Sequence, residues 1–214
     1  MFFYSPPYIL QKLSPSVLHW KVETLQKEIY LTFDDGPVNS LTHKVLKVLD
    51  QYQAKATFFC NGKQALENTE TIEMIKQSGH CLGNHTFSHT DGWRSSLKHY
   101  LEDVKRCDDV FQSSLFRPPY GRITPGQAKV LSKQYNIVMW SLMTFDFHPK
   151  VKPERSLRIM KRKAAPGSII LMHDSEKAEG NVISILTGVM EYFSGSGFTF
   201  NSLESVFPKK SLMI

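Results

Sequence analysis

The chain has 214 residues, of which 41% are hydrophobic and 21% are charged, a balance typical of a globular domain with a full core. Its formal net charge of +6 is too diffuse to indicate nucleic-acid binding. The three cysteines, Cys60, Cys81 and Cys107, are widely spaced, which predicts reduced and buried thiols and argues against a disulfide framework.

The sequence shows no clear targeting signal. Residues 1–10 are apolar, but they include no basic residue and are interrupted by Pro6 and Pro7, so we expect no signal peptide. No apolar run approaches the length of a membrane span. These features predict a cytoplasmic chain by default, with export as the open alternative, and they leave the oligomeric state unknown.

The chain divides into three parts by its local patterns. Residues 1–27 contain Pro6, Pro7 and Pro15 and predict an irregular lead-in, residues 28–207 predict one domain, and residues 208–214 predict a short tail. Within the domain, the predicted strands are at 29–34, 55–60, 81–85, 114–117, 136–141, 167–172 and 198–200. The predicted helices are at 41–49, 67–78, 97–110, from 124 onward, 153–164 and 181–194. About seven strands alternating with helices predict an α/β fold, a mostly parallel sheet with barrel-like closure.

The first predicted strand ends in two adjacent carboxylates, Asp34 and Asp35, followed by Gly36 and Pro37. Because successive side chains of a strand alternate between its faces, the two carboxylates can enter one pocket only if the strand breaks there. Gly36 and Pro37 supply that break. Paired carboxylates at this position suit metal ligation or proton transfer, and an ordinary Asp-Gly turn is the alternative.

Other polar side chains also follow predicted strands. His85 and His89 come after the third strand, Arg117 after the fourth and Asp146 beyond the fifth, while His173 follows the sixth. In barrels of parallel strands, functional sites form at the face where the strands end. We therefore expect these segments to converge on one mouth, together with the paired carboxylates.

The two histidines are the strongest metal signal. His85 and His89 are four residues apart and can meet on one helical turn or across a tight loop, a spacing that suits one zinc-like ion. Asp35 would complete a set of two imidazoles and one carboxylate with open positions, as catalytic metal sites have.

The remaining candidates each allow two interpretations. Arg117 is either an exposed residue of a Pro-rich loop or a bidentate partner that orients a carboxylate. Asp146 and His173 could pair as a histidine with an orienting acid. Alternatively, Asp146 is a plain loop residue, and His173 with Asp174 marks the start of a helix.

With these residues in place, the chain resembles the polysaccharide deacetylase family, carbohydrate esterase family 4, also called the NodB-homology domain. Five motifs carry the resemblance over about residues 28–206. In the family's order they are Thr32-Phe-Asp-Asp-Gly36, His85-Thr-Phe-Ser-His89, Arg117-Pro-Pro-Tyr120, Trp140-Ser-Leu-Met-Thr-Phe-Asp146-Phe147 and Ile169-Ile-Leu-Met-His173. The resemblance implies an irregular (β/α) barrel of seven or eight strands, with the active site at its C-terminal mouth.

The resemblance also implies roles for the residues at the metal. Asp35, His85 and His89 would bind one divalent ion, Zn²⁺ in the first place, with Co²⁺ or another divalent ion as alternatives. Asp34 would be the general base, held in position by Arg117.

Further roles follow from the later motifs. His173 would be the acid that protonates the departing amine, and Asp146 would be its partner. The backbone N–H of Tyr120, with the metal, would stabilise the oxyanion. Phe147 offers an aromatic wall to a sugar ring.

Three positions depart from the family's usual pattern. The family usually has Pro where this chain has Thr90, and the fourth motif usually has an Asp and a Trp where Met143 and Phe147 stand. None of these changes affects the proposed ligands or acid–base groups. They do weaken any transfer of the family's usual substrate preference.

Taken together, the resemblance implies a metal-dependent hydrolase that removes N-acetyl, or alternatively O-acetyl, groups from an amino-sugar polymer such as peptidoglycan or a chitin-like oligosaccharide. The alternatives are a hydrolase of a small non-sugar amide on the same fold, and a catalytically silent glycan-binding domain. The complete set of ligand and acid–base residues favours an enzyme. We expect an acetylated glycan as its partner and no nucleic acid.

A run of basic residues is left outside this assignment. It comprises Lys150, Lys152, Arg155, Arg158, Lys161, Arg162 and Lys163. Such a run predicts a solvated helix face, and the alternative is that it steers an anionic glycan toward the mouth.

Overall fold

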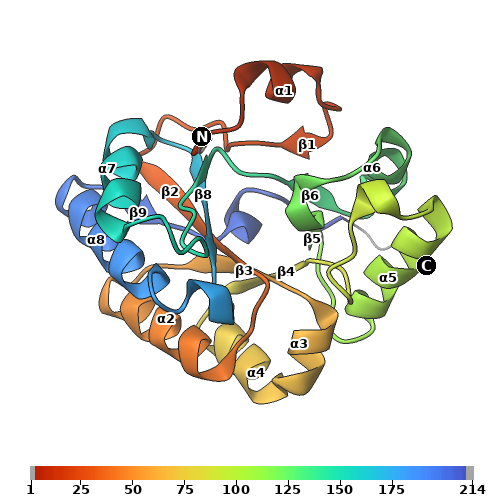
Figure 1. Cartoon of the computed structure of the whole chain (residues 1–214), viewed down its shortest axis with the longest axis horizontal. Helices are drawn as coiled ribbons and strands as arrows, with labels where there is room; N and C mark the ends of the chain where they lie inside the picture. Colours follow the sequence, from red (N-terminus) through yellow and green to blue (C-terminus); the bar gives the residue numbers. More distant parts are fainter. Residues whose placement is uncertain (1–2, 211–214) are drawn as a thin grey trace.

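One sheet of parallel strands, curled into an open barrel and covered by helices, forms the body of the molecule in the computed structural model, which describes residues 3–210 (Figure 1). The strands are β1 (Leu18–His19), β2 (Glu28–Asp34), β3 (Ala56–Cys60), β4 (Cys81–Asn84), β5 (Leu115–Phe116), β6 (Asn136–Val138), β7 (Leu142–Met143), β8 (Ser168–His173) and β9 (Thr199–Phe200). The helices are α1 (Tyr8–Leu13), α2 (Asn39–Gln51), α3 (Gly62–Glu67), α4 (Thr69–Gln77), α5 (Leu97–Asp108), α6 (Pro125–Leu131), α7 (Pro153–Lys163) and α8 (Val182–Gly195).

The strand order is β1-β6-β5-β4-β3-β2-β8-β7, with β9 pairing to β2. The strand pairs in the described part of the chain are all parallel. Because β1 and β7 stand at the two ends of this order, the sheet is an incompletely closed barrel. The predicted class, an irregular (β/α) barrel, is confirmed.

Strand β2 lies at the centre of the sheet, and its alternation separates two environments. Ile29, Leu31 and Phe33 belong to the large apolar core that also contains residues of α2 and α8. Tyr30 faces the other way, into a smaller cluster that includes Phe59. This second face continues toward the C-terminal end of β2 and leads to the functional side chains.

Two predictions about the chain's outline are wrong. The lead-in predicted as irregular over residues 1–27 contains α1 and β1, because β1 finds a partner in β6 that the local sequence does not reveal. The predicted set of about seven strands also omits β1 and β7. Residues 1–2 and, in the predicted tail, residues 211–214 lie outside the described part.

A third prediction needs a smaller correction. The predicted helix over 67–78 corresponds to α4, but the prediction misses α3, which lies directly before α4 and is separated from it by Asn68 outside the helical conformation (φ −130°, ψ 49°). Helix α6 begins as predicted, with Thr124 accepting from the Gln127 N–H in a capping box and Pro125 in the first turn. The three cysteines are free and buried, also as predicted. Within residues 3–210, no helix is both long enough and apolar enough to cross a membrane.

Gly167 supports the start of β8 through a close backbone approach, and this generates a stability prediction. Its φ of 80° is in the left-handed region, and a Cβ placed there would lie 1.9 Å from the Val22 carbonyl oxygen. We expect Gly167→Ala to lower the free energy of unfolding by at least about 1–2 kcal/mol, because a non-glycine residue is strained at this φ, and the backbone contact must also yield. Urea unfolding monitored by circular dichroism measures this change.

Gly126→Ala is the matched control. Gly126 lies in the first turn of α6, where an added methyl group would meet open space. The free energy of unfolding should stay the same or rise by up to about 1 kcal/mol, because alanine favours a helix over glycine. Equal losses in both variants would contradict the role assigned to Gly167.

Candidate active site

The strand β2 ends in a turn that brings both carboxylates to one cavity. Asp34 is the last residue of β2 and is 4% exposed. Asp35 then adopts a left-handed backbone (φ 78°) ahead of the Gly36-Pro37 bond, which interrupts the strand alternation. Asp34 and Asp35 consequently line the same cavity, as the sequence predicted for a broken strand.

A third carboxylate, Asp174, holds this turn from behind. Its Oδ1 accepts a hydrogen bond from the Gly36 N–H at 3.2 Å, and its Oδ2 accepts from the Thr42 hydroxyl at 2.7 Å. Burial raises the pKa of Asp174 to about 7, although the hydrogen bond from the Thr42 hydroxyl acts in the opposite direction. The Asp174 carboxylate packs closely against Gly36, since a Cβ added at Gly36 would lie 2.2 Å from it. Asp174 therefore ties the end of β8 to the turn that carries Asp34 and Asp35.

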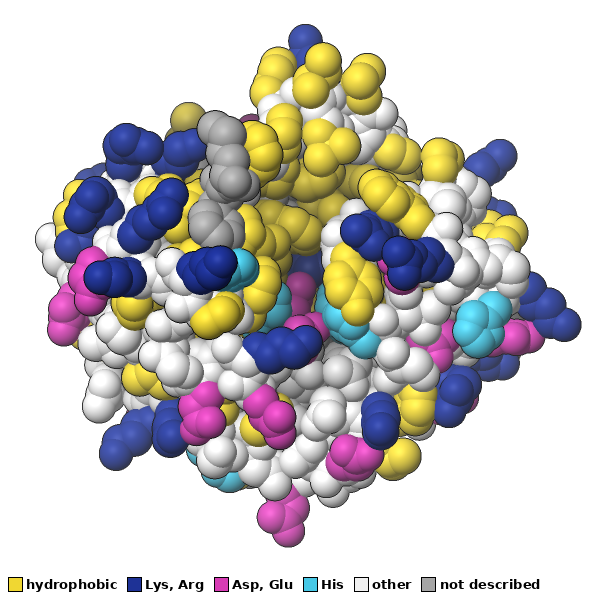
Figure 2. Space-filling view, viewed as in Figure 1, with side chains coloured by type: hydrophobic (Ala, Val, Ile, Leu, Met, Phe, Trp, Pro, Cys, Tyr) yellow, Lys and Arg dark blue, Asp and Glu magenta, His cyan; other side chains and the backbone are white. Residues whose placement is uncertain are grey.

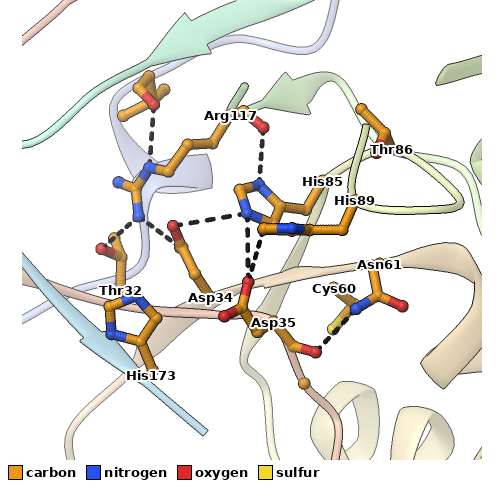
Figure 3. Close-up of polar contacts among 12 residues, drawn as sticks. Thr32, Asp34, Asp35, Cys60, Asn61, His85, Thr86, His89, Arg117 and His173 are labelled. Carbon is orange, nitrogen blue, oxygen red and sulfur yellow. Dashed lines mark hydrogen bonds and ion pairs between the residues drawn. The ribbon is translucent and has the colours of Figure 1, made fainter. Parts of the chain in front are cut away.

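Asp35, His85 and His89 form a cluster with metal-ligand chemistry (Figure 3). One ligand atom from each lies within 4.8 Å of the others. His89 Nε2 is 3.0 Å from Asp35 Oδ1, and His85 Nε2 is 3.5 Å from the same oxygen. Burial alone would raise the pKa of Asp35, but the two imidazoles, in the form that carries a proton on Nε2, donate to it and hold its pKa far below the usual range. The carboxylate is therefore ionised, as a metal ligand must be.

The orientation of His85 favours ligation further. Its Nδ1 lies 2.7 Å from the Arg117 carbonyl oxygen, an acceptor, so Nδ1 carries the proton and donates. In the neutral ring, Nε2 then presents a lone pair toward Asp35. Metal-binding histidines commonly have such an outer partner, so the donor set fits a divalent ion.

The loop between the two histidines is held by a buried acid. Thr86 and His89 both have left-handed backbones (φ 62° and 55°), so the pair meets across a tight loop and not on a helical turn. Asp103 of α5 accepts from the Ser88 N–H at 3.0 Å and from the Thr90 hydroxyl at 2.7 Å. Thr90 therefore fastens the loop through its side chain at the position where the family usually has Pro.

Arg117 is fully buried and touches Asp34 directly. Its Nη1 donates to Asp34 Oδ1 at 2.7 Å and to the Thr32 hydroxyl at 2.8 Å. Its Nε and Nη2 donate to the carbonyl oxygens of Val138 (3.0 Å) and Met139 (2.8 Å). The predicted bidentate pair with a carboxylate is therefore wrong, because the fork is divided between a carboxylate and two main-chain carbonyls. The prediction of a buried orienting cation is compatible with this geometry.

His173 and Asp146 form a second ion pair across the mouth. Strand register places His173 beside Asp34, since the two are paired across β8 and β2. His173 Nδ1 lies 2.9 Å from Asp146 Oδ1, and the His173 N–H donates to Asp146 Oδ2 at 2.7 Å. Burial alone would lower the pKa of His173, but the charge of Asp146 outweighs it and raises the pKa to about 9. His173 is therefore protonated at neutral pH.

These groups line one cavity of about 500 Å³, which opens on the face shown in Figure 2. Its polar residues include Asp34, Asp35, Asn61, His85, His89 and His173. Its apolar wall includes Val38, Tyr120, Trp140, Met143, Phe147 and Leu171. The cavity thus combines a compact ionisable floor with a broad apolar side.

The structure brings together all nine residues that the sequence singled out. Asp34, Asp35, His85, His89, Tyr120, Phe147 and His173 line the cavity, while Arg117 and Asp146 are buried behind it. Tyr120 is 61% exposed and has a left-handed backbone (φ 59°). Phe147 packs edge-on against the His173 ring, with 4.7 Å between the ring centroids. The roles of these residues remain predictions.

Sequence reasoning missed three supporting residues. Asp174 does not start a helix, because its side chain reaches back to Gly36. Asn61 caps α3 and also donates to the Asp35 carbonyl oxygen at 2.9 Å. Asp103 holds the histidine loop. Only Asn61 had a local signal, a helix cap directly after a strand.

This geometry describes a cavity at the mouth of a (β/α) barrel with a donor set that fits a divalent ion, and comparison with known proteins gives the family. The polysaccharide deacetylase family model matches residues 21–140. The chain belongs to the polysaccharide deacetylase family.

A relative and two solved structures illustrate the similarity. A peptidoglycan-N-acetylglucosamine deacetylase of Bacillus cereus is 32% identical over 189 residues, which cover 84% of this chain and 68% of the relative. A peptidoglycan N-acetylglucosamine deacetylase in complex with 4-naphthalen-1-yl-N-oxidanyl-benzamide has a TM-score of 0.87 at 27% identity, covering 95% of this chain and 97% of the other. A pseudoenzyme from Bacillus anthracis has a TM-score of 0.80 at 23% identity, covering 92% and 70%, and shares the fold.

The anchoring of the carboxylate turn by Asp174 generates a second prediction. Asp174→Ala removes the acceptor for the buried Gly36 N–H and the Thr42 hydroxyl. Each buried group left without a partner costs about 1–3 kcal/mol, so the free energy of unfolding should fall by that order. Catalytic turnover should fall more steeply than substrate affinity, because the turn positions reacting groups. Thermal unfolding and steady-state kinetics measure the two effects.

Asp174→Asn serves as the graded comparison. Asparagine keeps the shape and one acceptor oxygen, so it can satisfy one of the two donors. Its stability and turnover should lie between those of the alanine variant and the wild type. An alanine variant with wild-type turnover would show that the turn does not depend on Asp174.

Proposed function

We propose that this chain is a metal-dependent hydrolase that removes N-acetyl groups from an amino-sugar polymer, with peptidoglycan as the leading substrate. The observation that carries the proposal is the single cavity shared by a ligand cluster and two separate acid–base groups, Asp34 and His173. The similarity to peptidoglycan-N-acetylglucosamine deacetylases supports the choice of substrate.

Asp35, His85 and His89 would hold one divalent ion, with Zn²⁺ the leading candidate. Two imidazoles and a carboxylate with open positions suit zinc in catalytic sites, and Co²⁺ accepts the same donors. A divalent ion in such a site polarises a carbonyl group and lowers the pKa of water. The chain's contribution is to keep Asp35 ionised and His85 in the tautomer that presents Nε2.

Asp34 is suited to act as the general base. Arg117 fixes its Oδ1 at 2.7 Å, which leaves Oδ2 facing the ligand cluster, 3.9 Å from His85 Nε2. A water molecule that attacks the acetyl carbonyl at this position can lose its proton to Oδ2. The Tyr120 N–H would then donate to the oxyanion that develops on the substrate.

His173 is suited to act as the general acid. Its Nδ1 is engaged by Asp146, so Nε2 remains to donate a proton to the nitrogen of the departing amine. An amine is a poor leaving group without that proton. The wall of Trp140, Met143 and Phe147 would receive the sugar ring beside this acid.

The proposal is tested by acetate release. Purified protein should release acetate from peptidoglycan or from chitin-like oligosaccharides after addition of Zn²⁺ or Co²⁺, and chelation should abolish the release. O-acetylated xylan and small aryl acetamides serve as comparison substrates. Turnover of the small amides alone would favour the non-sugar amidase, and glycan binding without acetate release would favour the silent domain.

Variants of the ligand cluster give the third prediction. His85→Ala should bind less than one tenth of the metal of the wild type, since it removes one of about three ligands. Asp34→Asn should keep its metal and lose activity by about 10²–10⁴-fold, as expected for the loss of an acid–base group. Metal analysis and acetate release measure the two properties separately. Equal metal content in His85→Ala and the wild type would contradict the ligand assignment.

The ion pair between His173 and Asp146 gives the fourth prediction. A general acid acts only when protonated, so activity should fall on the alkaline side as the pH passes the His173 pKa of about 9. In Asp146→Asn the carboxylate charge is lost, while burial still lowers the His173 pKa. The alkaline limb of kcat/KM should therefore move toward lower pH by about one unit or more.

The control in this experiment is metal content. It should be the same in Asp146→Asn and in the wild type, because Asp146 does not belong to the ligand cluster. A pH profile for both proteins at saturating metal separates the possibilities. An alkaline limb that stays in place or moves upward would mean that Asp146 does not tune His173.

A further inference from the structure

Two surface features have no part in the proposed reaction. The first is an apolar segment, defined here as Phe3, Tyr8, Ile9, Leu10 and Leu13, all on or next to α1. The second is a basic helix, α7 with the residues that lead into it. Both features flank the mouth of the cavity (Figure 2).

The apolar segment is exposed to an unusual degree. Leu13 is 80% exposed, Tyr8 is 70%, and Ile9 is 67%. No residue of α1 is buried, although four of its six residues are Tyr, Ile or Leu. Exposed apolar side chains that are scattered need no explanation, but a contiguous group marks an interaction surface.

The basic helix carries a strong charge of one sign. Residues 150–163 contain seven Lys or Arg residues and one acid, Glu154. All seven basic residues are exposed. Figure 2 shows their dark blue side chains gathered on the upper left of the same view in which the yellow apolar segment stands at the top.

The two features are joined through Tyr4. Its ring lies 5.9 Å from the Arg155 guanidinium, and its carbonyl oxygen accepts from the Met143 N–H at 2.9 Å. Trp20, whose Nε1 donates to Ser14 Oγ at the end of α1, packs its ring against Trp140 of the cavity wall, with 6.4 Å between centroids. Tyr4 and Trp20, which lie near the apolar segment in the chain, therefore link its part of the chain to the basic helix and to the cavity wall.

We propose that the apolar segment and the basic helix together dock the protein onto an anionic lipid bilayer, with the mouth of the cavity facing the lipid headgroups. The apolar side chains of α1 would enter the boundary between headgroups and acyl chains, as interfacial helices do. The basic helix would be attracted by the negative surface potential. This docking is independent of the reaction assigned above.

Charge and polarity together select this partner over two others. A soluble polyanion would satisfy the basic helix but would leave the apolar side chains in water. A second copy of the chain could cover the apolar side chains, but it would bring two basic helices close together. An anionic bilayer complements both the apolar and the basic parts.

Vesicle flotation tests the proposal with the whole chain. The protein should float with vesicles of phosphatidylcholine and phosphatidylglycerol, and more weakly with phosphatidylcholine alone. Ile9→Ser with Leu13→Ser should reduce the bound fraction about tenfold or more, because two exposed apolar side chains no longer enter the lipid. Arg158→Gln with Lys161→Gln should reduce it about tenfold, and added salt should weaken binding further.

The controls carry the same chemical changes elsewhere on the surface. Leu66→Ser replaces an exposed leucine of α3, and Lys98→Gln with Lys105→Gln neutralises two exposed lysines of α5. Both should bind vesicles like the wild type. Acetate release from a soluble substrate should be unchanged in every variant, because none of these residues lines the cavity.

Three results would overturn the proposal. The first is absence of binding to anionic vesicles. The second is an equal loss of vesicle binding in the α1 and α3 variants. Binding to soluble polyanions that does not depend on the α1 side chains would count against the proposal in the same way. The third is a dimer, detected by sedimentation, that Ile9→Ser with Leu13→Ser dissociates, because the apolar segment would then be an interface between copies.

Discussion

The burial of the Arg117 guanidinium is the constraint on which the rest of the site depends. Moving a charge into a protein interior costs several kcal/mol unless its donors are satisfied. Here the donors reach Asp34, Thr32 and two main-chain carbonyls, and the guanidinium lies over the Phe59 ring at 4.1 Å. The ends of β2, β5 and β6 are thereby held together around one side chain.

The same residue also organises the ligand cluster. The Arg117 carbonyl oxygen accepts from His85, so its main chain sets the tautomer of one proposed ligand while its side chain sets the position of Asp34. A lysine has no planar fork with which to bond both Asp34 and the Val138 and Met139 carbonyls. The architecture therefore specifies arginine at this position, beyond its positive charge.

Much of this arrangement could be predicted from the sequence. The placement of Asp34, His85 and His173 after predicted strands indicated a common mouth, because parallel strands end at one face. The five ordered motifs added the fold class. Patterns of this kind work when the signal is local, as for a strand followed by a carboxylate, or when several motifs occur in a fixed order.

The unpredicted parts depend on contacts between distant segments. The bond from the Gly36 N–H to Asp174 joins residues 138 positions apart, and it exists only because β2 pairs with β8. The division of the Arg117 donors depends likewise on where β6 ends. Strands β1 and β7 are defined by their pairing with β6 and β8, which lie far along the chain.

The departures from the family pattern differ in their structural consequences. At Thr90 the loop is restrained by hydrogen bonds to Asp103 and Thr86, so the loss of proline is compensated. Met143 and Phe147 both line the cavity, where they present a thioether and a phenyl ring in place of a carboxylate and an indole. The first departure therefore concerns only how the loop is held, while the other two alter the lining of the cavity.

The left-handed turn at Asp35 makes the two proposed steps depend on different kinds of structural link. Asp34 and Asp35 share one peptide bond, so their Cα atoms remain about 3.8 Å apart whatever the surrounding sheet does. The distance between the proposed base Asp34 and the proposed ligand Asp35 is thus set by covalent bonds. The distance between Asp34 and His173 is instead set by hydrogen bonding between two strands. The spacing of Asp34 and Asp35 in the proposed attack is therefore fixed within one strand end, whereas the proposed protonation of the departing amine relies on the pairing of β2 with β8.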